Sequence, residues 1–307
     1  MSRKIAVLIP CYNEAEAIGK VIDDFKKELP AATIYVYDNN STDNTYEIAR
    51  QHGAVVKKEL RQGKGSVVRR MFREIDADLY VMIDGDDTYI ASDVHKLLKT
   101  QHEMNADMVV GDRLSAGRYD RQNRRMFHSF GNKLVTKLIN TLYNANLGDI
   151  MSGYRVFTKE FVKNFPIHND GFETETEMNM HALDKKFQIA EVPVGYKERM
   201  EGSESKLNTF KDGFSILKTI FWLFKDYKPL QFFSIIAAVF FSLSLAAGMP
   251  VVLEYFETHY VTHLPLAVLA VGLMLVAIVS LFVGFILDTV VRKHREIFEL
   301  RRLEKRL

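Results

Sequence analysis

The sequence is poor in several residue types, and each scarcity excludes a class of protein. It has one cysteine, Cys11, among 307 residues, so no disulfide can form within the chain, as is typical of a domain in the cytoplasm. The formal net charge is only +2, and the basic residues cluster near the C-terminal end rather than among aromatic residues. We therefore expect no nucleic-acid partner. Residues 1–4 lead directly into a short apolar strand, so we also expect no signal peptide.

Charge is missing altogether from two long segments near the C-terminal end. Neither Phe232–Leu253 nor Leu264–Leu287 contains a charged residue, and each is long enough for the ~20 residues that cross a bilayer core. The alternative, two buried helices of a soluble core, is disfavoured because neither segment has a polar face. The connection Glu254–His263 has no Lys or Arg, whereas the tail after Asp288 is rich in both. The positive-inside rule thus predicts a multi-pass cell-membrane protein, with a transmembrane hairpin whose two ends and whose preceding domain are cytoplasmic.

The charged part of the chain precedes this hairpin. Asn208–Lys228 alternates phenylalanine with lysine, which favours an amphipathic helix at the membrane interface, with a core helix of the soluble domain as the alternative. The domains that we expect are a catalytic domain (1–207), a juxtamembrane helix (208–230), a transmembrane hairpin (231–289) and a basic cytoplasmic tail (290–307). Apolar residues in that tail leave a homo-oligomer open.

Strand and helix patterns alternate through the first 200 residues. This order predicts an α/β fold, a Rossmann-like and mostly parallel sheet with helices on both faces. The expected strands are Lys4–Ile9, Thr33–Tyr37, Ala54–Lys57, Leu79–Ile83, Met108–Gly111, Tyr154–Thr158 and Gln188–Pro193. The expected helices are Glu14–Glu28, Thr45–His52, Lys64–Ile75, Ser92–Glu103, Lys133–Tyr143 and Thr174–Lys185.

One of these strands ends in carboxylates. The apolar run Leu79–Ile83 is followed directly by Asp84, Gly85 and Asp86. Ligands of open α/β sheets bind beyond the carboxyl ends of the strands. Two aspartates at that edge suit Mg²⁺ or Mn²⁺, which would bridge to a diphosphate, although Asp and Gly are also ordinary turn formers.

Three further polar segments end or follow neighbouring strands. Pro10–Glu14 ends the first strand, Asp38–Thr45 ends the second, and Gln62–Gly65 opens a helix. A carboxylate here can accept hydrogen bonds from a ribose or a base, whereas Ser41, Thr42 and Asp43 also fit a plain helix cap. Lys64 at a helix N-terminus suits an anion, but the spacing is not that of a Walker loop.

Taken together, these motifs resemble family 2 glycosyltransferases of the GT-A fold, over about residues 5–207. The downstream motifs are similar to those of the polyprenyl-phosphate sugar synthases, which include dolichol-phosphate mannose synthase and bacterial undecaprenyl-phosphate sugar transferases. Those motifs are Gly111-Asp-Arg113, Asp149-Ile-Met-Ser-Gly-Tyr-Arg155, Gly171-Phe-Glu173-Thr-Glu175 and Val192-Pro-Val-Gly-Tyr196-Lys-Glu-Arg199.

The resemblance implies an inverting transfer of a sugar from a nucleotide-diphosphate sugar, with a UDP-sugar favoured over GDP-mannose, to a polyprenyl phosphate. It implies that Mg²⁺ or Mn²⁺ is held by Asp84 and Asp86, which are catalytic together with Asp149. The residues implied to bind the nucleotide sugar are Pro10, Tyr12, Glu14, Asp38, Lys64, Asp84, Gly85 and Asp86. Those implied for the acceptor phosphate are Arg113, Arg125, Arg155 and Arg199, and Glu173 and Glu175 would orient the sugar or a neighbouring residue.

Other functions remain open at this point. Processive polysaccharide synthases carry a Gln-x-x-Arg-Trp sequence, which is absent around the only tryptophan, Trp222. A family 2 enzyme could also act on a saccharide or on another lipid. A non-catalytic membrane scaffold is disfavoured because Asp84, Asp86, Lys64 and Arg155 are all present.

Overall fold

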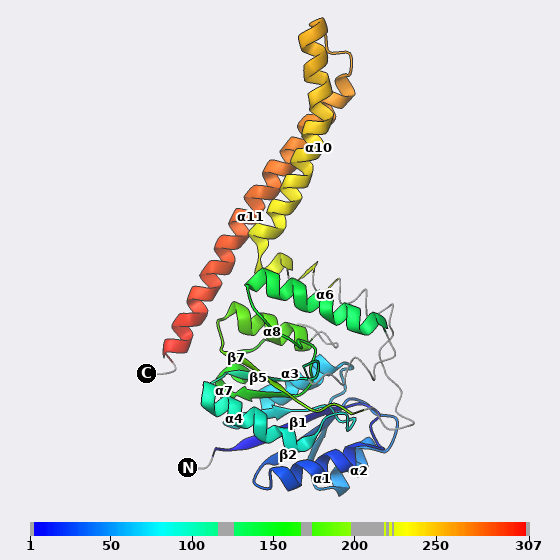
Figure 1. Ribbon diagram of the computed structural model, residues 1–307, viewed down its shortest axis with the longest axis vertical. Helices are drawn as coiled ribbons and strands as arrows, with labels where there is room; N and C mark the ends of the chain where they lie inside the picture. Colours follow the sequence, from blue (N-terminus) through cyan, green and yellow to red (C-terminus); the bar gives the residue numbers. More distant parts are fainter. Residues whose placement is uncertain are drawn as a thin grey trace. The chain divides into compact units, whose positions relative to one another are not determined.

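The computed structural model of the chain separates into two compact units, residues Met1–Ile216 and Leu217–Leu307. It describes residues 3–115, 126–166, 174–197, 218, 221–222 and 224–304, and the side chains of 126–133 lie outside that description. The first unit is built on a sheet and the second on two long helices (Figure 1).

The first unit contains the expected mostly parallel sheet. Its seven strands follow the order β3-β2-β1-β4-β6-β5-β7, and only β6 runs antiparallel to its neighbours. The sequence pattern did not predict that reversal, because the pattern of buried side chains is the same for both strand directions. The strands are β1 (Ile5–Cys11), β2 (Thr33–Asp38), β3 (Val55–Lys58), β4 (Leu79–Met82), β5 (Met108–Asp112), β6 (Arg155–Thr158) and β7 (Ile189–Pro193).

Helices cover both faces of this sheet. They are α1 (Ile18–Glu28), α2 (Thr45–Gln51), α3 (Lys64–Glu74), α4 (Val94–Met104), α6 (Met126–Tyr143), α7 (Lys159–Asn164) and α8 (Thr174–Asp184), with a short 3₁₀ turn η1 (Ala91–Asp93) before α4. The helix expected at Lys133–Tyr143 is thus longer, beginning at Met126. The short helix α7 was not predicted, and the order and type of the other main helices and strands agree with the sequence prediction.

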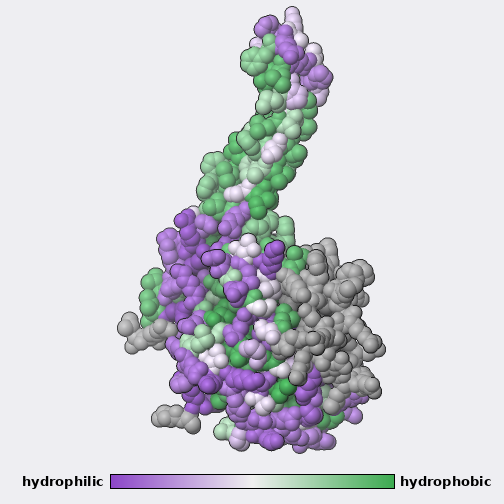
Figure 2. Space-filling view, viewed as in Figure 1, coloured by the Kyte–Doolittle hydropathy of each residue, from purple (hydrophilic) through white to green (hydrophobic). Residues whose placement is uncertain are grey.

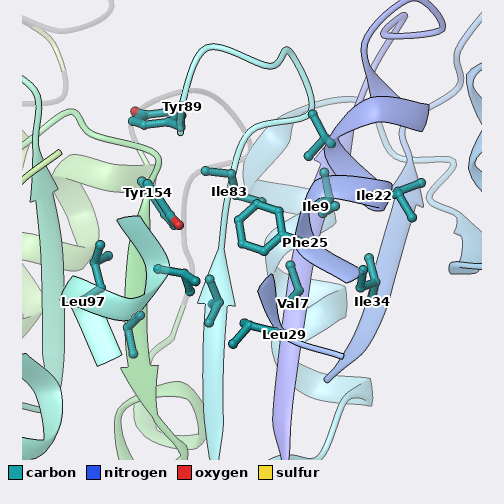
Figure 3. Packing of buried hydrophobic residues seen from close by; sticks show 14 of the residues in the cluster. Val7, Ile9, Ile22, Phe25, Leu29, Ile34, Ile83, Tyr89, Leu97 and Tyr154 are labelled. Atoms are coloured by element: carbon teal, nitrogen blue, oxygen red, sulfur yellow. The ribbon is translucent and has the colours of Figure 1, made fainter. Parts of the chain in front are cut away.

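Each face of the sheet has its own apolar core. On one face, Phe25 of α1 packs among Val7, Ile9 and Ile34 of the strands, and its ring meets that of Tyr154 edge to face at 6.2 Å (Figure 3). On the other face the core is aromatic: Phe157 of β6 stacks on Phe161 of α7 at 5.1 Å. Because successive strand residues point to opposite faces, both cores immobilise the same strands. The carboxyl ends of β1, β2 and β4 therefore form a rigid edge.

The second unit is a hairpin of α10 (Pro229–Thr258) and α11 (Leu264–Glu304). Both helices are long and apolar enough to cross a membrane, and the visible face of the hairpin is largely hydrophobic (Figure 2). They extend past the apolar segments predicted at 232–253 and 264–287, α11 by about 17 residues into the basic tail. Most of the amphipathic segment predicted at 208–230 lies outside the described residues, and residues 224–227 of it are helical.

A seam of mostly small residues joins the two helices. The buried residues Ala237, Ser244 and Val251 on α10, and Ala270, Ala277 and Gly284 on α11, recur at intervals of seven. Ser244 Oγ donates a hydrogen bond to the carbonyl oxygen of Ala270 at 2.8 Å. A Cβ atom added at Gly284 would lie 3.0 Å from Cβ of Phe233. Such small residues let two helix backbones approach closely in a membrane.

Candidate active site

The loops after β1 and β2 are bonded to each other. Asn13 has the left-handed φ of 52°, which turns its amide toward Ser41 Oγ (2.9 Å), and its side-chain oxygen accepts the Thr42 amide at 2.8 Å. The Glu14 amide donates to Thr45 Oγ1 at 2.8 Å. The hydroxyl and amide groups of the Asp38–Thr45 segment therefore brace the Pro10–Glu14 loop, in addition to beginning α2. Tyr12 and Glu14 are half-buried beside that contact, and Pro10 is buried in β1.

Two side chains at the end of β2 organise the next loop. Asp38 is buried and accepts the Ser41 amide at 3.3 Å. Its neighbour Asn39 donates to the carbonyl oxygens of Glu59 and Arg61 and accepts the Gly63 amide at 2.6 Å. Asn39 thus fixes the loop that delivers Lys64 to the start of α3.

Lys64 joins two carboxylates that are far apart in the sequence. Its Nζ lies 2.6 Å from Asp84 Oδ1 and 2.5 Å from Glu175 Oε1 on α8. Burial alone would lower the pKa of Lys64, but the two carboxylates outweigh it and raise the pKa, so the side chain stays charged. The structure therefore brings together Lys64, Asp84 and Glu175, three of the residues that the sequence indicated.

Asp86 lies in the turn that follows Asp84. It is buried, and the Thr88 hydroxyl donates to its Oδ1 at 2.6 Å. The next residue, Asp87, pairs instead with Lys20 at 2.8 Å and Lys197 at 3.3 Å. Gly85 between the aspartates is close to β1, since a Cβ there would lie 2.7 Å from Cys11 Sγ. Any larger residue at position 85 would therefore have to displace the Cys11 side chain.

The carboxylates of Asp84 and Asp86 fit a cation that is held jointly with a substrate. Among the described residues, no three His, Cys, Asp or Glu side chains cluster closely enough to hold a metal ion by themselves. Mg²⁺ is usually bound by one or two carboxylates plus substrate phosphates rather than by an all-protein cage. Two carboxylates at a strand end match that second arrangement.

A buried ion pair follows β5. Arg113 donates through Nε to Asp149 Oδ2 at 2.7 Å and through Nη2 to Oδ1 at 2.9 Å, and its guanidinium lies 5.4 Å from the centre of the Tyr196 ring. Asp149 is completely buried. A two-point bond of this kind fixes the plane of the guanidinium group. Arg113 and Asp149, which the sequence placed in separate motifs, thus form one unit.

Arg155 has a different environment from the one that the phosphate-binding hypothesis requires. It is fully buried, donates through Nε to the Ser152 carbonyl and through Nη2 to the Ile150 carbonyl, both at 2.8 Å, and its Nη1 contacts Met108 Sδ. Burial lowers its pKa, which the surrounding carboxylates oppose. In this structure Arg155 holds the 150–152 loop from inside, so the geometry argues for a structural role. Arg125, Glu173 and Arg199 lie outside the described residues.

The loop before β6 links the ion pair to Asp84. A Cβ added to Gly153 would lie 2.3 Å from Asp84 Oδ2, and the Gly153 amide donates to the Tyr89 hydroxyl at 2.9 Å. Burial raises the pKa of Tyr89, with Arg113 opposing and Asp84 reinforcing the shift, so the hydroxyl stays protonated. Residues 149–153 therefore connect Asp149 to the predicted metal ligand.

Sequence reasoning missed three contributors: Gly153, Tyr89 and Glu191. Glu191 on β7 accepts the amides of Gly148 at 2.7 Å and Asp149 at 3.2 Å. The sequence does offer a signal for Glu191, because it is the one charged residue in the strand Ile189–Pro193. Gly153 lies inside the Asp149–Arg155 motif, but the motif alone did not indicate its close approach to Asp84, and Tyr89 had no comparable signal.

Comparisons with known proteins agree with this geometry. The pattern of the family described as "Glycosyl transferase family 2" matches residues 6–165. Glycosyltransferase AglJ of Haloferax volcanii is 32% identical over 303 residues, covering 98% of this chain and 97% of that protein. The dolichyl-phosphate hexose transferase of the same organism is 32% identical over 217 residues, covering 70% and 92%.

Solved structures share the fold. Glucosyl-3-phosphoglycerate synthase from Mycobacterium tuberculosis, solved in complex with Mn²⁺, UDP and glucosyl-3-phosphoglycerate, superimposes with a TM-score of 0.58 at 20% identity, covering 73% of this chain and 80% of that chain. At 20% sequence identity this structural similarity supports the GT-A fold and nothing further. The family pattern and the full-length relative together show that the chain belongs to glycosyl transferase family 2 and is a glycosyltransferase.

Proposed function

We propose that the enzyme transfers a sugar, with inversion, from a nucleotide-diphosphate sugar to a polyprenyl phosphate. The observation that carries this proposal is that the 149–153 loop links two charged groups: Lys64 with Asp84 and Glu175, which Gly153 approaches, and Arg113, which pairs with Asp149. Relatives named for dolichyl-phosphate hexose transfer and dolichol-phosphate mannosyl transfer support the acceptor class, and the two candidate membrane spans suit a lipid substrate. A UDP-sugar is favoured over GDP-mannose.

The donor occupies the edge formed by β1, β2 and β4. Pro10, Tyr12, Glu14 and Asp38 line the nucleoside slot, and Lys64 offers its charge to the diphosphate or the sugar. Asp84 and Asp86 would hold Mg²⁺ or Mn²⁺ on the diphosphate, where a divalent ion neutralises charge on the departing nucleotide. Glu175, which Lys64 already fixes, orients the sugar.

The acceptor approaches from the Arg113 side. A phosphate oxygen of the lipid attacks the anomeric carbon as the bond from that carbon to the nucleotide diphosphate breaks, so one bond forms, one breaks, and the electron pair leaves with the diphosphate. A phosphate monoester with a second pKa of ~6 is already ionised, so little general-base help is required. The main task of the site is to hold two anions together, which Arg113, oriented by Asp149, can do.

The proposal has a direct test. Detergent-solubilised protein is incubated with undecaprenyl or dolichyl phosphate, Mn²⁺ and a panel of UDP- and GDP-sugars, and the products are identified by mass. We expect one glycosylated polyprenyl phosphate. Transfer only to a saccharide or a neutral lipid, with polyprenyl phosphate unused, would contradict it and favour the alternative acceptors.

We also propose that the catalytic unit and the C-terminal tail are cytoplasmic. The support is the basic tail after Asp288 and the absence of Lys and Arg from Glu254–His263. After Cys11 is replaced by serine, single cysteines at Thr258 and Glu299, both exposed positions, are treated in intact cells with an impermeant thiol reagent. Labelling is expected at 258 and not at 299, and the reverse result would overturn this orientation.

A further inference from the structure

Glu191 lies at a point where the sheet meets the Asp149 loop. It is on β7, opposite Val110 of the parallel neighbour β5, and its side chain is only partly accessible. Its Oε2 accepts the Gly148 amide at 2.7 Å and its Oε1 accepts the Asp149 amide at 3.2 Å. One carboxylate thus receives two consecutive backbone amides of a loop that is more than 40 residues away in the sequence.

The neighbourhood of this contact leaves the loop little room to shift. A Cβ added at Gly148 would lie 3.1 Å from Asp112 Oδ2 and 3.5 Å from Glu191 Oε2, so the backbone at position 148 fits between two carboxylates. Asp112 is engaged in its own loop, accepting the Leu114 amide at 2.8 Å. On the other side of the loop, Asn140 of α6 exchanges two hydrogen bonds with Leu147, both at 2.9 Å.

The loop determines where Arg113 points. Asp149 is completely buried and holds Nε and Nη2 of Arg113 at 2.7 and 2.9 Å, so a displacement of the Asp149 backbone moves the guanidinium with it. The path runs from Glu191 to the Gly148 and Asp149 amides, then to the Asp149 carboxylate, and then to Arg113. The first and last steps are hydrogen bonds, and the middle step is the covalent frame of Asp149 itself.

We infer that Glu191 is a positioning residue for the acceptor side of the active site, setting the orientation of Arg113 through the backbone of Asp149. An ionised carboxylate is required because both of its oxygens accept, and hydrogen bonds to a charged acceptor are roughly twice as strong as neutral ones. A glutamine of the same size offers one accepting oxygen, and its NH₂ group would face a second donor. This inference rests on the proposed role of Arg113 in binding the acceptor phosphate.

The first test is independent of any substrate. Hydrogen exchange of the amides in residues 145–151 is compared between the full-length wild type and Glu191→Gln. We expect exchange of this segment to become about tenfold faster in the variant, the loss expected for one charge-assisted hydrogen bond, with no change in residues 38–45. Glu103→Gln, which removes an exposed carboxylate on α4, is the matched control and should change neither segment. Equal exchange in wild type and Glu191→Gln would overturn the inference.

The second test separates positioning from a general structural role. In Glu191→Gln the KM for polyprenyl phosphate should rise about tenfold while the nucleotide affinity, measured by calorimetry with Mn²⁺ present, stays unchanged. Glu191→Asp keeps the charge and should recover part of the loss. Because the effect passes through Arg113, it should shrink in an Arg113→Lys background. Equal losses of donor and acceptor binding, or additive effects of the two substitutions, would contradict the inference.

These outcomes distinguish the inference from the proposed function. If wild type makes no glycolipid from polyprenyl phosphate, the proposed acceptor is wrong, and the exchange comparison decides on Glu191 alone. If wild type makes the glycolipid and Glu191→Gln is indistinguishable from it in exchange and in KM, the acceptor stands and the positioning role is wrong.

Discussion

The two halves of the active-site edge are held together in different ways. On the β1, β2 and β4 side, charged groups such as Lys64 and Asp84 are present, but hydrogen bonds between neutral groups join the loops, as in the Asn13 contacts with Ser41 and Thr42. On the β5, β6 and β7 side, buried charges do so: Asp149 and Arg155 are completely buried. Neutral contacts near solvent can be exchanged at little cost when a ligand enters, whereas a buried charge that loses its partner is strongly destabilising. The comparison teaches that the loops of the proposed donor half can adapt around a rigid strand edge, whereas the loop of the proposed acceptor half is fixed in advance.

The largest effect is expected where the two halves meet, at the paired aspartates. Asp84→Asn or Asp86→Asn should lower turnover by on the order of a thousandfold, because each removes a carboxylate proposed to hold the divalent ion on the diphosphate. Turnover is measured with saturating nucleotide sugar, with and without excess EDTA. Asp87→Asn, whose carboxylate pairs with Lys20 and Lys197, is the neighbouring control and should lose much less. Full activity of both variants in EDTA would exclude the metal role.

The next prediction concerns the fixed half. Arg155→Met should lower the free energy of unfolding of the catalytic unit by about 3 kcal/mol, because it leaves the buried carbonyls of Ser152 and Ile150 without their donor. Unfolding is followed by near-ultraviolet circular dichroism of tyrosine, since the only tryptophan, Trp222, belongs to the other unit. Arg73→Met, at a side chain that is 73% exposed, should have almost no effect.

Acceptor kinetics of the same variant discriminate between the two roles of Arg155. A phosphate-binding role, which the family resemblance implied, predicts that Arg155→Met, like Arg155→Ala, weakens acceptor use by roughly ten- to a hundredfold. From its burial we now expect the loss to appear in stability. Unchanged stability together with a large rise in acceptor KM would restore the phosphate-binding role.

A smaller effect on turnover is expected at Gly153, where the backbone of the 149–153 loop approaches Asp84. Gly153→Ala places a Cβ about where Asp84 Oδ2 now lies, so the carboxylate must move. Overpacking of this kind costs ~1–3 kcal/mol, and we expect turnover to fall about tenfold. Gly272→Ala is the matched control, because nothing lies within 4 Å of the added Cβ. Steady-state kinetics of both variants give the comparison, and equal activity would mean that Asp84 does not need its present position.

The smallest effect is expected at the outer surface of the donor half. Three side chains donate hydrogen bonds to the Glu74 carboxylate and lower its pKa to about 2. Lys57 has the largest effect, and Arg70 and Tyr37 add to it. A carboxyl group with a depressed pKa stabilises the fold above its ordinary pKa and loses that contribution as pH falls toward the depressed value. Glu74→Gln should therefore cost about 1 kcal/mol at pH 7. The difference from wild type should vanish between about pH 4.5 and pH 2, as measured by urea unfolding at each pH. A difference that persisted at pH 2 would contradict it.

The sequence predicted the donor half better than the acceptor half, for a physical reason. Motifs such as Asp84-Gly-Asp86 and Pro10–Glu14 follow parallel strands directly, so strand order alone brings them to one edge. The acceptor half depends on β6, which reverses direction, and on contacts such as Glu191 with Gly148 that cross the sheet. The family resemblance implied that Arg155 binds the acceptor phosphate, and the planar fork of arginine suits phosphate. Its burial depends on the course of the 150–152 loop, which no local pattern predicts.

The spacing of small residues along the hairpin has a consequence for how the enzyme can be handled. In lipid or detergent no hydrophobic force drives two apolar helices together, so their pairing depends on close packing and hydrogen bonds. Ala237, Ser244 and Val251 against Ala270, Ala277 and Gly284 supply the close packing, and Ser244 supplies a hydrogen bond to Ala270. Detergent tails can replace lipid around such a pair without competing for its interior. If the two candidate spans cross a membrane, the hairpin is therefore expected to leave the bilayer still paired, so that the purified enzyme carries it intact into the assays.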